Sequence, residues 1–222
     1  MNDWIKKLAS LKLTVVLLVL LLVALAAGTL SESSQNADAA GRLVYYSFWF
    51  RALLLAMGIN TILAIAVRWP PSNYRIGFLL THTAMLVILV GALVSARFKV
   101  EGQLALWEGQ ESPVISMRTD SPTAAQATLP FTVRLDAFEI DYYPGTHRPA
   151  MFRSRVTVTD PELGGSFPAV IWMNHELSYR GYKLFQSSYQ QAGGRKMSVL
   201  SVSHDPGQLI VFIGYFLLLG GM

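Results

Sequence analysis

One stretch constrains this chain more than any other: residues 76–96, which lie between Arg75 and Arg97 and carry no formal charge. At ~1.5 Å per residue, about 21 helical residues reach across the ~30 Å hydrocarbon layer of a bilayer. We therefore predict a membrane-spanning helix here. His82 is unusual in that setting, because its imidazole sits roughly a third of the way along the span, where lipid offers no water to either ring nitrogen. His82 therefore needs a partner.

Long apolar runs place the whole chain among membrane proteins. It has 222 residues, of which 52% are hydrophobic and only 14% charged, too apolar for an ordinary soluble protein. Further uncharged runs fill residues 13–30, 52–67 and 209–222, whereas residues 97–205 have ordinary globular content. The net charge of +4 does not indicate nucleic-acid binding, because no basic stripe is interleaved with aromatic residues. Cysteine is absent, which excludes thiol redox chemistry and haem attachment through the chain's own thiols.

The distribution of lysine and arginine predicts the orientation in the membrane. Three lysines precede the first span, Leu13–Leu30, and two arginines bound the short connection between the second span, Phe48–Val67, and the third. By the positive-inside rule the N-terminus is cytoplasmic and residues 97–205 are extracytoplasmic. A secretory signal peptide is the alternative for the first run. Its apolar core is longer than that of most signal peptides, which favours a retained helix.

The extracytoplasmic segment has the pattern of a β domain. Alternating apolar and β-branched stretches between turn formers predict strands at residues 131–143, 151–159, 166–173, 182–189 and 196–203. The expected fold class is an α + β membrane protein with four transmembrane helices and an antiparallel β-rich domain between helices 3 and 4. The predicted boundaries are 1–96, 97–205 and 206–222. About 16 residues from Gly207 reach only ~24 Å, so we expect the fourth helix to be truncated.

Several segments share their sequence and their order with one known family. They are Ala9–Thr14 and Gly28–Leu30 around the first helix, Leu80–Met85 and Gly91–Ala92 in the third, Asn174–Tyr189 in the β domain, and Asp205–Gly207 before the last helix. Together they resemble the ResB family, also called CcsB, of cytochrome c biogenesis proteins. The segment Asn174–Tyr189 is the most specific of them, and Glu176 stands where the family commonly has a proline.

The resemblance implies a function in the bacterial cytoplasmic membrane. The chain would be one subunit of a system II cytochrome c synthase complex, which exports haem b and presents it for attachment to apocytochrome c. The partner subunit, resembling ResC or CcsA, carries a tryptophan-rich haem-binding segment. The five tryptophans of this chain are scattered, so we expect a non-catalytic or co-catalytic subunit. The resemblance also implies that His82 is an axial ligand of the haem iron and that the partner supplies the other.

The chemistry of His82 is compatible with that role. Haem iron accepts a neutral imidazole nitrogen, and a lipid setting disfavours the charged imidazolium. Helical spacing places Gly77, Ala84 and Gly91 on one seam of small residues, which we expect to pack within the subunit. His82 lies nearly opposite, with further candidate haem contacts at Phe78, Met85, Leu86 and Leu89. The alternative is a structural histidine that bonds a neighbouring carbonyl or a threonine side chain across helices, and spacing alone leaves both interpretations open.

The remaining polar candidates are accessory. Arg75, at the inner end of the third span, is a candidate partner for a haem propionate, and His204 is a candidate haem contact near the outer surface. His175 is interpreted as a packing residue and His147 as a solvated turn residue, and their spacing does not suit a zinc site. Two other functions stay open: a membrane-anchored scaffold or receptor with a protein-binding β domain, and a quinone-linked redox subunit. The second is disfavoured, because the spans hold no other titratable residue for a proton relay.

Overall fold

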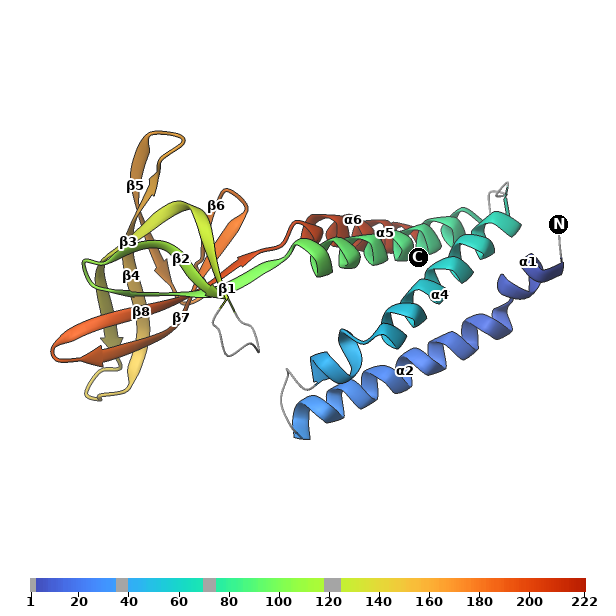
Figure 1. Ribbon diagram of the computed structural model, residues 1–222, viewed down its shortest axis with the longest axis horizontal. Coiled ribbons are helices and arrows are strands. Elements are labelled where there is room, and N and C mark those ends of the chain that lie inside the picture. Colours follow the sequence, from blue (N-terminus) through green and yellow to red (C-terminus); the bar gives the residue numbers. More distant parts are fainter. Residues whose placement is uncertain (1–2, 35–39, 70–74, 118–124) are drawn as a thin grey trace. The chain divides into compact units, whose positions relative to one another are not determined.

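The computed structural model describes residues 3–34, 40–69, 75–117 and 125–222. The chain divides into two compact units, one formed by Met1–Arg97 together with Gly207–Met222 and the other by Phe98–Pro206. The first unit is helical and the second consists of strands (Figure 1). The β unit is thus an insertion between two helices of the helical unit.

The helical unit contains the apolar runs of the sequence. Its elements are α1 (Asp3–Leu8), α2 (Leu11–Ser34), the π-helix η1 (Gly41–Tyr45), α4 (Phe48–Val67), α5 (Ile76–Phe98) and α6 (Gly207–Gly221). Within the described residues, three segments are long and apolar enough to cross a membrane: Trp4–Ser34, Phe48–Val67 and Ile76–Phe98. The predicted second span coincides with α4, and α2 is longer than predicted at both ends. The final helix is apolar but has only 15 residues.

Two of the long helices begin with a side-chain cap. The Ser10 hydroxyl accepts a hydrogen bond from Leu13 N at 3.3 Å at the start of α2, and the Ser47 hydroxyl accepts one from Phe50 N at 3.3 Å at the start of α4. Each cap satisfies an amide that has no acceptor within its own helix. Beyond the caps, most apolar side chains of these helices are exposed, as expected of surfaces that face lipid.

Glycine allows α5 and α6 to pack closely. A Cβ added to Gly91 would lie 2.7 Å from Val211 Cγ2, and one added to Gly77 would lie 2.8 Å from the carbonyl oxygen of Gly221. Between these points Ala84 is completely buried. The prediction that the small-residue seam packs within the chain is therefore confirmed, with α6 as its partner.

The β unit forms one curled antiparallel sheet. Its strands are β1 (Val100–Trp107), β2 (Glu111–Met117), β3 (Gln126–Tyr142), β4 (Pro149–Asp160), β5 (Gly165–Trp172), β6 (Leu177–Tyr179), β7 (Tyr182–Ala192) and β8 (Arg195–His204). The order across the sheet is β5-β4-β3-β2-β1-β8-β7-β6. Strand β5 also contacts β6 and β7, so the sheet closes on itself as a near-barrel (Figure 1).

Alternate residues of these strands fill the interior of the near-barrel. The buried core consists of Leu104, Leu106, Ile115, Leu129, Phe131, Val133, Leu135, Phe138, Val156, Val158, Ile171, Leu184, Leu200 and Val202. All five predicted strands are present, most of them longer than predicted, whereas β1, β2 and β6 were not predicted. Gly102 weakens the strand signal of β1, yet it is needed there, because a Cβ would lie 2.7 Å from Ser116 O of β2.

Candidate functional site

The imidazole of His82 is oriented by its own helix. Its Nδ1 lies 2.8 Å from the carbonyl oxygen of Phe78, one turn earlier. A carbonyl can only accept, so Nδ1 carries the hydrogen and the lone pair of the neutral ring is on Nε2. The Thr81 hydroxyl lies 3.3 Å from Nδ1 and 3.0 Å from the same carbonyl, which reinforces this arrangement. The local backbone therefore selects the tautomer of His82.

Phe78 also restrains the plane of that imidazole. The two ring centroids are 3.8 Å apart with an interplanar angle of 31°. The guanidinium carbon of Arg68 lies 4.9 Å from the Phe78 centroid, and Arg68 Nη1 donates to the Ala64 carbonyl at 2.9 Å. A cation over the face of an aromatic ring is favourable, so Arg68, at the end of α4, helps to fix the position of the Phe78 ring on α5. His82 is thus held by a carbonyl on one ring nitrogen and by an aromatic ring beside it.

Two cavities adjoin this side of α5. His82 lines a cavity of about 200 Å³ together with Thr14, Leu17, Leu18, Met57, Asn60, Thr61, Ala64 and Met85. A neighbouring cavity of about 340 Å³ lies between α4 and α5 and is lined by Leu54, Met57, Gly58, Thr61, Met85, Leu86, Ile88, Leu89 and Ala92. The wall opposite α5 comes from α2 and α4 of this chain. The face carrying His82 is therefore partly enclosed without a partner.

Asn60 is a polar residue of this site that sequence reasoning missed. It is only 4% exposed, its Nδ2 donates to the Leu8 carbonyl at 2.5 Å, and its Oδ1 accepts from the Thr14 hydroxyl at 2.8 Å. An amide without partners is costly in an apolar setting, and these bonds satisfy it while they tie α4 to the beginning of the chain. The signal in the sequence is a lone asparagine in the apolar run 52–67, where a side-chain amide needs hydrogen-bond partners.

The other candidates on α5 gather on the same side, whereas the accessory ones do not. Met85 lines both cavities, and Leu86 and Leu89 line the larger one. Phe78 contacts His82 directly. Arg75 immediately precedes α5, is exposed, and lines neither cavity.

His204 belongs to the β unit and is the last residue of β8, where it pairs with Tyr182, the first residue of β7. Its Nδ1 lies 2.8 Å from the Gly181 carbonyl, and its ring stacks on Tyr182 at 4.6 Å and 23°. Gly181 has a φ of +79°, and a Cβ there would lie 3.0 Å from His204 Cε1. These contacts give His204 a packing role where β7 begins and β8 ends.

Two further histidines of the β unit lie on its surface. His175 is exposed and stacks on Trp172 at 3.7 Å, and His147 lies in an exposed turn. Among the described residues, no group of three His, Asp or Glu side chains is placed to hold a metal ion.

Comparison with known proteins identifies the family. The sequence profile of the ResB-like family matches residues 72–199, more than half of the chain. The chain belongs to the ResB-like family. Two relatives of this ResB-like chain carry names from cytochrome c biogenesis: the CcsB proteins of Synechococcus sp. strains RCC307 and CC9902. They are 30% and 31% identical over 115 and 120 residues. Protein NrfI of Wolinella succinogenes is 40% identical over 94 residues.

The ResB-like chain spans only part of these relatives. The matched segments cover 42% of the chain but 10% of NrfI, and 52% of the chain but 24% of the CcsB protein of strain RCC307. Among solved structures, cytochrome c haem lyase CcmF aligns with 92% of the chain and 33% of its own length. That alignment has a TM-score of 0.41 and 18% identity, a likeness too loose to assign a fold.

In the β unit of the ResB-like chain, the family-like segment Asn174–Tyr189 builds a locked turn. Asp160, 2% exposed, accepts hydrogen bonds from the amides of Glu162 and Leu163, from the Tyr179 hydroxyl at 2.9 Å, and from Arg180 Nη1 at 3.1 Å. Burial by itself raises the pKa of Asp160, but these hydrogen bonds and the Arg180 charge together lower it. Arg180 has a φ of +48°, an uncommon conformation that the bonds to Asp160 and Glu162 hold. Two residues of this segment, Tyr179 and Arg180, therefore have a structural role in the turn.

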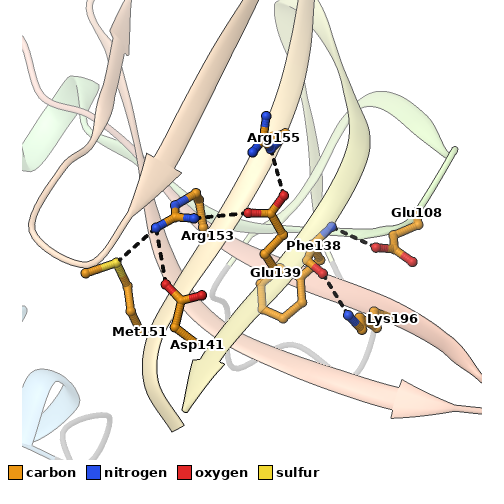
Figure 2. A network of polar contacts seen from close by, with 8 residues as sticks. All are labelled: Glu108, Phe138, Glu139, Asp141, Met151, Arg153, Arg155 and Lys196. Carbon is orange, nitrogen blue, oxygen red and sulfur yellow. Dashed lines mark hydrogen bonds and ion pairs between the residues drawn. The ribbon is translucent and has the colours of Figure 1, made fainter. Parts of the chain in front are cut away.

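A second polar network covers strands β3 and β4 (Figure 2). Glu139 accepts from Arg155 Nε at 2.8 Å and from Arg153 Nη1 at 3.1 Å, and Arg153 also contacts Asp141 at 3.2 Å. The hydrogen bond from Arg155, followed by that from Arg153, lowers the pKa of Glu139. Because positive and negative groups alternate here, this surface of the ResB-like chain does not form a patch of a single charge sign.

Proposed function

We propose that this chain is a haem-handling subunit of a cytochrome c synthase complex, with His82 as one axial ligand of the haem iron within the membrane. Membership of the ResB-like family and relatives named as cytochrome c biogenesis proteins support a role in that pathway. The observation that carries the proposal is the bond from His82 Nδ1–H to the Phe78 carbonyl. It leaves the lone pair on Nε2, the nitrogen that a metal would need.

The residues around His82 fit a haem. Ligating histidines commonly donate their second ring nitrogen to a backbone carbonyl, which fixes the tautomer and the ring orientation. The cavity beside His82 is lined mostly by apolar side chains from α2, α4 and α5, which suits the face of a porphyrin. Haem is the cargo in this proposal, and its iron supplies the coordination site, whereas the chain supplies the nitrogen base and a partly enclosed, mainly apolar surface.

The proposal includes the setting of the protein. The lysine and arginine distribution supports a bacterial cytoplasmic membrane protein with a cytoplasmic N-terminus and an extracytoplasmic β domain, divided at 1–96, 97–205 and 206–222. A ResC- or CcsA-like subunit supplies the second axial ligand, Arg75 is the candidate partner for a haem propionate, and apocytochrome c receives haem b on the outer side.

Substitution of His82 tests the proposal. In the full chain co-expressed with a ResC-like partner, His82→Ala should remove most of the Soret absorbance of the purified complex and lower cytochrome c maturation. Added imidazole should partly restore both, because it replaces the missing ligand. The control is His204→Ala, which should keep its haem because His204 packs the β unit. A well-folded His82→Ala complex with unchanged haem content would contradict the proposal.

A further inference from the structure

The cavity beside His82 is too small to enclose a porphyrin by itself. Its volume of about 200 Å³ lies below the roughly 300–1,000 Å³ of typical small-molecule sites. The neighbouring cavity of about 340 Å³ shares Met57, Thr61 and Met85 with it, so the two spaces adjoin across these three side chains. A ring coordinated by His82 therefore has adjoining space along α5.

We propose that the porphyrin ring lies in the groove between α4 and α5, bounded by Met57, Thr61 and Met85 and reaching toward Leu89. This inference rests on the proposed function and deepens it. It assigns one wall of the haem site to α4 of this chain and not only to a partner subunit.

The helix that supplies an axial ligand must lie beside the ring. Residues three, four and seven positions from His82 share its side of α5 and are the first to meet a porphyrin bound there. These residues are Met85, Leu86 and Leu89, and all three line the α4–α5 groove. Methionine adapts to irregular apolar shapes, so Met57 and Met85 are suited to pack on a flat ring.

A competing groove is larger but poorly connected to His82. It lies between α2 and α4, has a volume of about 500 Å³, and is lined by Leu17, Leu20, Val23, Ala24, Ala27, Trp49, Ala52, Leu53 and Ala56. It shares only Leu17 with the His82 cavity and has no lining residue from α5. A ring coordinated by His82 therefore fits the α4–α5 groove better.

Two matched tryptophan substitutions test the location of the ring. Leu89→Trp fills the α4–α5 groove and Leu53→Trp fills the α2–α4 groove, and both parent leucines are half-buried. In the full chain purified with its co-expressed partner, Leu89→Trp should lose most of the Soret absorbance. Added imidazole should not restore it, because the substitution removes space for the ring and not a ligand of the iron. Leu53→Trp and the volume-conserving Leu89→Met should keep their haem.

The outcomes separate this inference from the proposed function. If His82→Ala loses haem while Leu89→Trp keeps it, or while only Leu53→Trp loses it, the groove assignment is wrong and the ligand assignment stands. If His82→Ala keeps its haem, the ligand assignment fails and the groove assignment fails with it.

A second test uses cysteine substitutions, because the chain has no cysteine of its own. Met57→Cys introduces a single thiol into the proposed wall, and Leu53→Cys places one in the competing groove. Bound haem should slow alkylation of Met57→Cys by N-ethylmaleimide several-fold, compared with the same variant carrying His82→Ala. Leu53→Cys should react at the same rate in both backgrounds. Equal rates for Met57→Cys in both backgrounds would overturn the groove assignment.

Discussion

The two units of this protein treat their buried polar groups differently. In the β unit, Asp160 is satisfied by four donors, and the buried hydroxyls of Ser154 and Ser198 bond each other at 2.8 Å and share the Gln186 side chain. In the helical unit, His82 uses Nδ1 to bond its own helix and lines a cavity. The β unit thus satisfies its buried polar groups internally, whereas the helical unit satisfies Asn60 internally but keeps the half-buried His82 beside open space.

The apolar side chains show the same contrast. The β unit buries a continuous core of large side chains, including Phe131, Phe138 and Leu200. The described helices bury a smaller cluster formed by Ala24, Val44 and Phe50, and Leu17 is their only buried leucine. Packing of large side chains within the chain is therefore concentrated in the β unit, whereas the helices expose more of their apolar surface.

The largest effect expected of this contrast comes from core truncation. Leu200→Ala should destabilise the β unit by about 2–5 kcal/mol, because Leu200 is fully buried and its removal leaves a cavity. Leu219→Ala on α6 is the matched control, since Leu219 is 70% exposed and should change stability by less than about 0.5 kcal/mol. Thermal unfolding of the full chain in detergent, followed by near-ultraviolet circular dichroism, measures both. Similar losses of stability in Leu200→Ala and Leu219→Ala would contradict the contrast between the two units.

A smaller effect is expected from the polar tie in the helical unit. Asn60→Leu removes the bonds to Leu8 and Thr14 and should cost about 1 kcal/mol, the usual size of such bonds between membrane helices. Thr29→Val is the control, because the Thr29 hydroxyl bonds the Leu25 carbonyl of its own helix. Denaturant unfolding in detergent micelles compares the two. Equal stability of Asn60→Leu and the parent chain would show that the tie does not support the site.

The smallest effect is expected from the network in Figure 2. The pKa of Glu139 is lowered in the folded state, so its contribution is present above the ordinary glutamate value of 4.5 and is lost as the pH falls through the lowered value. Glu139→Gln should therefore lower the stability slightly at pH 7, where exposed ion pairs contribute weakly, and should match the parent chain at pH 3, so that the acid side of its stability profile is flatter. The unfolding midpoint measured from pH 3 to 7 tests this. An undiminished acid dependence in Glu139→Gln would assign it to other carboxylates.

Local pattern in the sequence was enough to predict the membrane helices, five of the eight strands in the described β unit, the small-residue seam and the unusual position of His82. These features depend on hydropathy and periodicity over a few neighbouring residues, so a linear chain displays them. Strand β1 was missed because Gly102 weakens its local signal, although close pairing with Ser116 of β2 requires a glycine there.

Other features could not be derived from local pattern. The bond from Asn60 to the Leu8 carbonyl, the α4 wall facing His82, and the two adjoining cavities each join residues far apart in the chain. The hydrogen on His82 Nδ1 depends on the side-chain conformation that brings the ring to the Phe78 carbonyl of the same helix, and hydropathy does not specify that conformation. Hydropathy predicts which segments enter a membrane. Which side chains then meet, and which spaces stay open between them, depends on packing in three dimensions.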